Sequence, residues 1–351
     1  MGAGKYTYHW LGDNYSTYIS LKESISGIFS FNIFGIPFTG ADICGFMKNS
    51  EKNLCVRWYN IGVFYPFSRN HNFIDSKDQF PWSFGPEARD IIKKDIEYRY
   101  SLIRYMYSQL FLISLNEKGS FFKPVLFEFP NEENSYNNIE NKIMFGEAFL
   151  ICAFYEESTN SKLFILPKAN FNLYPNGKNI MNYDTTERKI ELSGEFNQLH
   201  IFLRGGYIIP MQNSFDKYIM NTEVLRGEKL NLIINPDNLL KSKGVLFFDN
   251  DELDTVENKK YFRVDMSFEN KKMIFKLNKN NLEKYNYRDN IIEKIEIWRF
   301  SEIFGKATKV KAKFKESINS EGVLDTVNDK VIFDLNKEAI SIFDIEEILF
   351  E

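Results

Sequence analysis

The sequence has few residues of the types that bind transition metals. Only three cysteines and three histidines occur among 351 residues. The cysteines, Cys44, Cys55 and Cys152, lack the paired spacing of a structural zinc site. This spacing argues against a structural zinc site.

The sequence also lacks a strong charge excess and a long apolar run. Its formal net charge is -4, which predicts no general affinity for nucleic acid. The most apolar helical segment, Leu102–Leu115, is short and carries Arg104, whereas a membrane span needs about 20 apolar residues. The segment Met1–Tyr6 lacks the apolar region of a signal peptide. We expect no membrane segment and no signal peptide within this sequence.

Three apolar segments each end in polar residues, and these ends recur at a constant interval. Asp13 follows His9–Leu11, Asp42 follows Phe34–Ala41, and His71 follows Val63–Phe67. Asp13 and Asp42 are 29 residues apart, as are Asp42 and His71. One strand and one helix of a (β/α)8 barrel take about 30 residues together. The spacing predicts three neighbouring strand ends around one active site.

The first third of the chain alternates predicted helices and strands. Ser16 or Thr17 can cap a helix with apolar residues at helical spacing, and Pro86 can begin a long helix that ends by Gly119. A further helix is predicted over Glu51–Ile61, and short strands over Phe34–Ala41 and Tyr65–Phe67.

Short apolar segments separated by turn residues replace the helices after about Lys123. The first series is Val125–Phe129, Ala148–Tyr155, Lys162–Leu166, Lys189–Leu192, Leu199–Leu203 and Tyr207–Pro210. A second series follows an Asn- and Ser-rich break at Gln212–Thr222. Such series are typical of antiparallel sandwiches. We predict an α/β plus all-β chain: part of a (β/α)8 barrel over 1–123, a proximal β-sandwich over 124–212 and a distal β-sandwich over 213–351.

The polar residues at the strand ends suit acid–base chemistry on a sugar, although each also has a structural explanation. Asp13 beside the apolar wall of Trp10 is a candidate general acid, or else it caps the following helix. Asp42 either binds a ligand or pairs with Arg69, and Arg69 and His71 could likewise belong to an ion-pair network. Charged groups bind sugar hydroxyls and aromatic rings cover the sugar face, so Phe46 completes the candidate set.

The cysteines near this site leave two possibilities open. Cys44 and Cys55 flank the loop after Asp42. They are either reduced thiols or a disulfide that fixes this loop, and a disulfide would indicate an oxidising compartment.

Four longer motifs resemble glycoside hydrolase family 31, in particular its lysosomal acid α-glucosidase, maltase-glucoamylase and sucrase-isomaltase group. The motifs are Gly12-Asp13, Gly35–Phe46, Leu54–Trp58 and Phe64–Asn72, and Lys123–Pro130 and Leu203–Pro210 also fit. The resemblance implies that Asp13 is the general acid/base and that Trp10 and His71 bind the glucose. It implies that Asp42, Phe46 and Arg69 line or brace the pocket, and that Cys44 and Cys55 form a disulfide.

The resemblance further implies a retaining α-glucosidase that acts on maltose, malto-oligosaccharides, glycogen or starch and needs no metal or organic cofactor. Its full-length form would be lysosomal or secreted. The Cys44 and Cys55 pair argues against glucosidase II, which generally lacks it, while another specificity of the family, such as α-xylosidase, stays open.

The sequence departs from the family at the nucleophile. The family's Trp-x-Asp-Met-Asn-Glu motif does not occur in these 351 residues. We therefore expect the isolated polypeptide to be inactive. The alternative to an active full-length enzyme is a truncated paralogue or a carbohydrate-binding remnant, and the coding sequence upstream of Met1 would distinguish the two.

Overall fold

The computed structural model describes residues 7–185, 188–215, 217–249, 261–279, 290–314 and 318–351, so the Met1–Tyr6 segment lies outside it. The chain forms two compact units that alternate along the sequence. Unit 1 contains Met1–Arg99, Lys118–Lys168 and Thr186–Phe202, and unit 2 contains Tyr100–Glu117, Ala169–Thr185 and Leu203–Glu351. The predicted division into 1–123, 124–212 and 213–351 stays a prediction.

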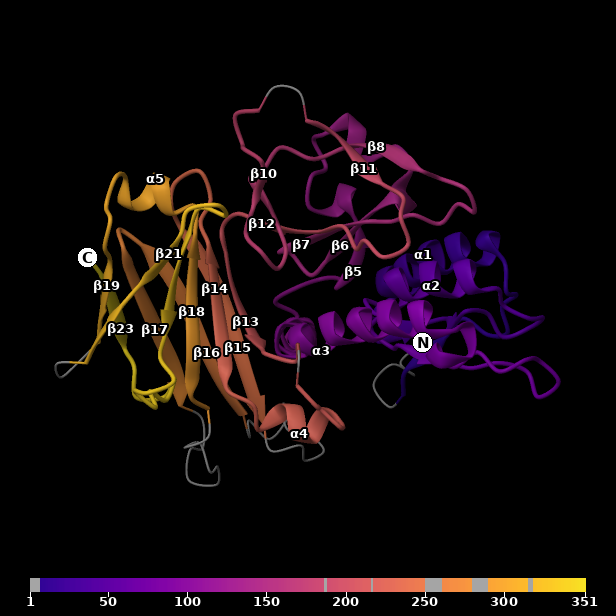
Figure 1. The fold of residues 1–351 in the computed structure, drawn as a ribbon, viewed down its shortest axis with the longest axis horizontal. Helices are drawn as coiled ribbons and strands as arrows, with labels where there is room; N and C mark the ends of the chain where they lie inside the picture. Colours follow the sequence, from indigo (N-terminus) through magenta and orange to yellow (C-terminus); the bar gives the residue numbers. More distant parts are fainter. Residues whose placement is uncertain (1–6, 186–187, 216, 250–260, 280–289, 315–317) are drawn as a thin grey trace. The chain divides into compact units, whose positions relative to one another are not determined.

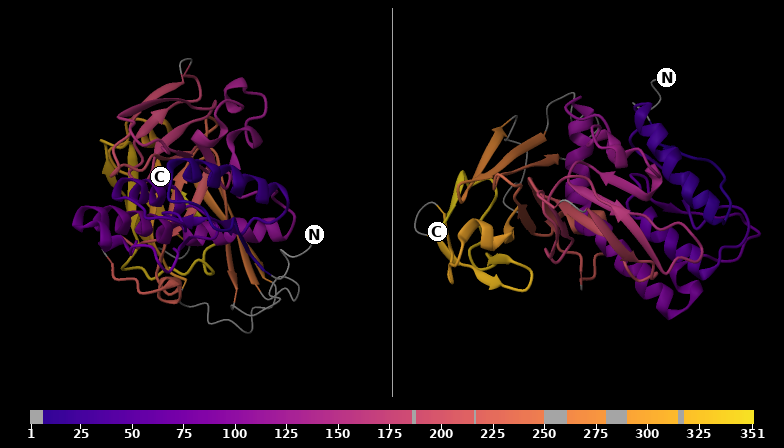
Figure 2. Two further views of the ribbon diagram at one scale, coloured as in Figure 1. Left: turned by 90° about the vertical axis from the view of Figure 1, so that its right-hand side faces the viewer. Right: turned by 90° about the horizontal axis from the view of Figure 1, so that it is seen from above.

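Three helices begin in unit 1 and appear in indigo to purple in Figures 1 and 2. They are α1 (Tyr18–Ile33), α2 (Lys52–Gly62) and α3 (Pro86–Ser114). The predicted N-terminal proline of α3 is confirmed, and the helix continues into unit 2. Among the described helices, none is long and apolar enough to cross a membrane.

Local signals define both ends of α1. Thr17 caps its N-terminus, because its side chain accepts a hydrogen bond from the Ser20 amide at 3.1 Å. At the other end Gly35 adopts φ +80°, and the Ile36 amide donates to the Phe31 carbonyl at 2.9 Å. This is a Schellman-type ending, in which glycine supplies the left-handed residue. The predicted strand Phe34–Ala41 is therefore too long.

The strands of the N-terminal region are short and pair in parallel, as expected for a barrel. They are β1 (His9–Trp10), β2 (Thr39–Gly40), β3 (Asp42–Ile43) and β4 (Arg69–Asn70). β1 pairs with β2, and β3 pairs with β4.

The predicted strand Tyr65–Phe67 is wrong. The guanidinium of Arg99 donates to the carbonyls of Val63, Tyr65 and Pro66 at 2.7, 2.7 and 3.0 Å. These carbonyls bind a helix side chain instead of a neighbouring strand, so the segment forms a turn and the strand begins only at Arg69.

The rest of unit 1 contains short antiparallel strands and 3₁₀ turns. Its strands are β5 (Phe122–Pro124), β6 (Lys142–Phe145), β7 (Phe149–Cys152), β8 (Ser161–Ile165) and β11 (Lys189–Ser193). The 3₁₀ turns are η2 (Pro81–Phe84), η3 (Val125–Phe127), η4 (Glu133–Ser135) and η5 (Ile139–Asn141). Of the six segments in the first predicted series, from Val125–Phe129 to Tyr207–Pro210, five contain a strand of the structure. The exception is Val125–Phe129, which begins with a 3₁₀ turn.

Unit 2 is dominated by one sheet of eleven strands, orange to yellow in Figure 1. They are β13 (Tyr207–Gln212), β14 (Leu230–Asn235), β15 (Ser242–Asp249), β16 (Tyr261–Glu269), β17 (Lys272–Lys279), β18 (Ile292–Trp298), β19 (Lys311–Lys313), β20 (Asn319–Glu321), β21 (Val323–Asp325), β22 (Lys330–Asp334) and β23 (Glu347–Phe350). The unit also contains β9 (Phe171–Leu173), β10 (Asn179–Met181), α4 (Thr222–Arg226) and α5 (Phe300–Phe304), while β12 (Ile201–Arg204) has residues in both units.

This sheet differs in two ways from the antiparallel two-sheet sandwich that the sequence predicts. β13 pairs with β15 and β14 pairs with β18 in parallel. The first and last strands of the sheet order, β20 and β21, are joined by Gly322 alone, so the sheet curls until its two edges approach each other. A Cβ at Gly322 would lie 2.4 Å from the Val331 side chain, which explains the glycine. The curled sheet encloses one apolar core to which β13–β18, β19, β22 and β23 contribute buried side chains.

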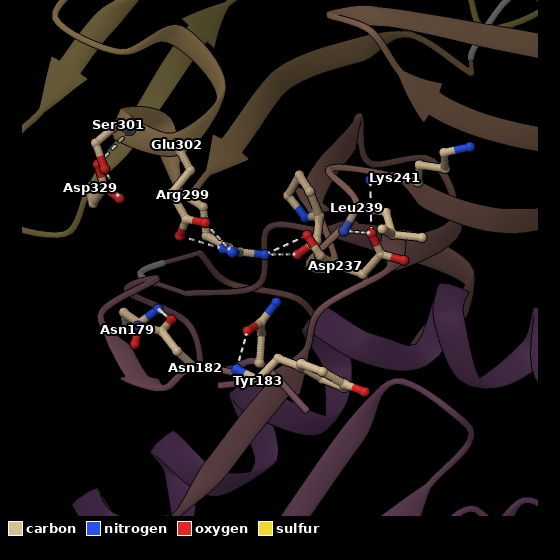
Figure 3. A network of polar contacts seen from close by, with 12 residues as sticks. Asn179, Asn182, Tyr183, Asp237, Leu239, Lys241, Arg299, Ser301, Glu302 and Asp329 are labelled. Atoms are coloured by element: carbon tan, nitrogen blue, oxygen red, sulfur yellow. Dashed lines mark hydrogen bonds and ion pairs between the residues drawn. The ribbon is translucent and has the colours of Figure 1, made fainter. Parts of the chain in front are cut away.

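A buried arginine holds one corner of unit 2 together. Arg299 precedes α5 and is only 4% exposed. Its guanidinium donates to the carbonyls of Pro236 at 2.8 Å and Asp237 at 2.6 Å, and it also pairs with Glu302. Figure 3 shows this side chain between Glu302 and the Asp237 turn. The turn is itself closed, because the Asp237 carboxylate accepts from the Leu239 and Lys241 amides.

We expect Arg299→Met to lower the free energy of unfolding of unit 2 by about 3 kcal/mol, because buried carbonyls lose charged donors. Hydrogen exchange of the β14 and β18 amides measures this loss. The control is Lys309→Met, which removes an exposed ion pair with Glu321 and should cost less than about 1 kcal/mol. Equal protection in the two variants would contradict the assignment.

Candidate functional site

The three predicted strand ends lie side by side in unit 1. Trp10 is in register with Gly40, and Asp42 is in register with Arg69. Only Ala41 separates β2 from β3, so the two parallel pairs share one connected edge. The interval seen in the sequence therefore corresponds to neighbouring strands, and it brings Trp10, Asp42 and Arg69 together.

A buried ion pair forms the centre of this edge. Asp42 is 1% exposed, and its Oδ1 accepts from Arg69 Nε at 2.9 Å and from a second guanidinium nitrogen. Its Oδ2 is buried with no hydrogen-bond partner in the structure. Burial raises the pKa of Asp42; Arg69 and His71 lower it, and the charge of Asp13 raises it. Four titratable groups from three strands therefore influence one another.

Asp42 thus pairs with Arg69, which is one of the two possibilities that the sequence left open. The guanidinium of Arg69 also lies over the rings of Trp10 and Phe67, at 5.4 and 5.7 Å from their centres. A guanidinium fixed on one side by a carboxylate and on another by an aromatic face has little freedom to move. Arg69 therefore positions Trp10.

Asp13 and Trp10 occupy the open side of the edge. Gly12 adopts φ +83°, a conformation that favours glycine, and the chain turns there directly after β1. Asp13 is exposed, and Trp10 is 42% exposed. Both side chains are therefore accessible to a ligand.

The loop after Asp42 carries Phe46 and is fixed at both ends. Cys44 and Cys55 form a disulfide, which links the loop to helix α2. Gly45 adopts φ +89°, and a Cβ there would lie 2.5 Å from the Ser16 backbone. The Phe46 ring centre lies 5.2 Å from that of His71, so the loop brings these two predicted residues together.

Two amide side chains that the sequence analysis did not single out hold this loop. Asn14 Oδ1 accepts from the Phe46 amide at 2.9 Å, and its Nδ2 donates to the Asp42 carbonyl at 3.0 Å. Buried Gln79 directs its Nε2 toward Asn70 Oδ1 at 2.9 Å and the Gly45 carbonyl at 3.1 Å. The position of Asn14 directly after Asp13 is a weak signal, and nothing in the sequence marks Gln79.

Across the described ranges, no cluster of three or more His, Cys, Asp or Glu side chains could hold a metal ion. The site offers one accessible carboxylate, a buried ion pair, a histidine and two aromatic rings. This set can protonate an oxygen and bind a polar ring that has an apolar face.

Two family models match consecutive parts of the chain. The glycosyl hydrolases family 31 TIM-barrel domain matches residues 1–109, and the glycosyl hydrolase family 31 C-terminal domain matches residues 118–209. The chain belongs to glycoside hydrolase family 31. Members of this family with glucosidase names are enzymes that hydrolyse glycosyl bonds.

Sequence relatives agree with the family. The chain is 31% identical over 341 residues to intestinal sucrase-isomaltase of Suncus murinus, an alignment that covers 95% of this chain and 18% of the relative. It is 31% identical over 263 residues to lysosomal α-glucosidase of Bos taurus, covering 72% of this chain and 27% of the relative. The chain therefore spans less than a third of the length of these proteins.

The fold is also that of a solved family member. The glucosidase II α subunit superposes with a TM-score of 0.86 at 21% identity, covering all of this chain and 38% of that one. At this identity the likeness establishes the fold alone. Together with the matched family models, it supports a barrel portion followed by a β-rich portion.

The disulfide predicts the thiol content of the protein. In the unfolded, unreduced chain, we expect one thiol to react with Ellman's reagent, namely Cys152, and three after reduction. In the folded chain, by contrast, Cys152 should be unreactive, because burial raises the pKa of its thiol to about 12.

A Cys152→Ser chain is the control and should show no thiol before reduction. Three thiols in the unreduced unfolded protein would contradict the pairing.

Replacing Cys44 and Cys55 together by alanine should lower the free energy of unfolding by about 3 kcal/mol, through loss of the short loop closure.

Proposed function

We propose that residues 1–351 form the acid/base half of a retaining α-glucosidase site that acts on α-linked glucose. The observation that supports this most is the parallel pairing of β1 with β2 and of β3 with β4. That pairing places the Asp13 strand end beside the Asp42–Arg69 ion pair. The family assignment supplies the reaction class, and the names of the sequence relatives favour α-glucosides.

Asp13 is the proposed general acid and base. It is the accessible carboxylate of the site, and it follows a strand end and a glycine turn, a common position for catalytic residues of parallel barrels. As an acid it would protonate the glycosidic oxygen while a second carboxylate attacks the sugar. As a base it would then deprotonate the water that hydrolyses the covalent intermediate.

The other predicted residues would bind glucose. Trp10, fixed against Arg69, offers an aromatic face, and His71 beside Phe46 offers a ring nitrogen for a hydroxyl. Buried Asp42 keeps Arg69 in place, so its role is chiefly to position the guanidinium. The Cys44–Cys55 disulfide would hold Phe46 at the pocket and suits a lysosomal or secreted location.

The attacking carboxylate is not among the assigned residues. A retaining enzyme needs two carboxyl groups about 5 Å apart. Asp42 is unsuitable as the second one, because its carboxylate is buried and pairs with Arg69. The absence of a Trp-x-Asp-Met-Asn-Glu motif from these residues is the observation that favours the alternative, a non-catalytic carbohydrate-binding chain.

We expect Asp13→Asn, in a polypeptide that also carries the nucleophile, to lower kcat on maltose about 10²- to 10⁴-fold. Hydrolysis of an aryl glucoside with a good leaving group should fall much less, because bond cleavage then needs little protonation. The control is Asp75→Asn, a change of the same kind at an exposed position, which should leave both rates unchanged. Asn14 is not suitable for a control, because its side chain holds the loop. Equal losses on the two substrates would contradict the acid role.

We expect the isolated 351-residue polypeptide to hydrolyse neither maltose nor p-nitrophenyl α-glucoside. The measurement is glucose or nitrophenol release by purified protein, with a chain carrying Asp13→Asn as the background control. Turnover that disappears in that control would show that a nucleophile is present within these residues.

A further inference from the structure

Unit 2 contains a cavity of about 480 Å³ that shares no residue with the strand-end site. It lies beside the second half of α3, which contributes Arg104 and Tyr107. It is also lined by Arg226 at the end of α4 and Asp249 at the end of β15. A cavity of this volume holds a small organic molecule.

Arg104 is the unusual residue of this cavity. It is 7% exposed, its Nε is buried without a hydrogen-bond partner, and within the described ranges no carboxylate lies at ion-pair distance from it. Its guanidinium lies over the Phe248 ring, with 4.8 Å between the guanidinium carbon and the ring centre. A cation–π contact offsets only part of the cost of burying a charge.

The neighbouring carboxylate is already engaged by other groups. Asp249 Oδ2 accepts a hydrogen bond from the Tyr107 hydroxyl, and Asp249 Oδ1 lies 3.7 Å from the guanidinium of Arg226. Glu223, the other acid of the cavity wall, is exposed to solvent. Asp249 is therefore engaged by Arg226 and Tyr107, and among the described residues it makes no direct ion pair with Arg104.

Arg104 nevertheless stays a cation at neutral pH. Burial and the charge of Arg226 lower its pKa to about 10, and Asp249 and Tyr107 act in the opposite direction. Two guanidinium groups thus line one cavity, and the buried Nε of one of them has no hydrogen-bond partner. Planar guanidinium donors match the oxygens of carboxylates and phosphates.

We propose that this cavity binds a small oxyanion, a phosphate or carboxylate group, between Arg104 and Arg226. The anion would accept hydrogen bonds from both side chains and neutralise the buried charge of Arg104. The cavity exceeds the size of a bare phosphate, so the oxyanion can be part of a larger small molecule.

Calorimetric titration of the 351-residue protein at constant ionic strength tests the proposal. Inorganic phosphate and acetate are the two probes, and they distinguish a phosphate from a carboxylate site. We expect saturable binding of at least one of them. Arg104→Met and Arg226→Gln should each weaken it about tenfold or more, through loss of a charged donor.

Arg89→Met is the matched control, because Arg89 is an exposed arginine of the same helix that pairs with Asp90. It should bind the anion as the parent does. If Arg104→Met fails to fold, Arg226→Gln decides, since that side chain is partly exposed. No saturable binding of either anion, or equal weakening by Arg89→Met, would overturn the proposal.

Discussion

The buried Asp42–Arg69 pair is the interaction on which the candidate site depends. Asp42 is held between two parallel strand pairs where water cannot solvate it, so its charge requires Arg69. Arg69, once fixed, positions the Trp10 ring on the first strand. One ion pair therefore sets the relation among three strand ends that are distant in sequence. Removing Arg69 would leave the Asp42 carboxylate buried and unpaired, and removing Asp42 would release the guanidinium that lies over Trp10.

The surrounding loop is fixed by contacts of a different kind. The Cys44–Cys55 disulfide, the amide of Asn14 and the buried amide of Gln79 all act on the backbone around Phe46. These contacts restrain the loop before any ligand is present, so the loop loses less conformational entropy when a ligand binds. A rigid loop beside an exposed Asp13 suits a site in which the sugar, not the protein, moves into position.

Much of the N-terminal fold and of the candidate site was predictable from the sequence, because the residues that define helix ends and strand ends act locally. A cap at Thr17, a terminating glycine at Gly35 and polar residues at the repeat of a barrel unit act within one or two elements. What could not be predicted depends on distant partners. Arg99 takes the carbonyls of the Tyr65 turn from more than 30 residues away, and the parallel pairing of β14 with β18 crosses nearly 60 residues. Neither periodicity nor propensity encodes such contacts, which is also why Gln79 carried no signal.

Comparison of the buried arginines shows why the cavity of unit 2 is different from a structural site. Arg299 gives its donors to two carbonyls and a carboxylate, and Arg57 donates to the Gly194 carbonyl while its guanidinium lies 4.3 Å from the Phe196 ring centre. Each of these arginines joins segments of backbone that would otherwise be separate. Among the described residues Arg104 has no such carbonyl or carboxylate partner, and its guanidinium lies against the Phe248 ring, although its burial is nearly as complete. A buried guanidinium whose close contact is an aromatic ring is retained at a cost in stability, and an anionic ligand would offset this cost.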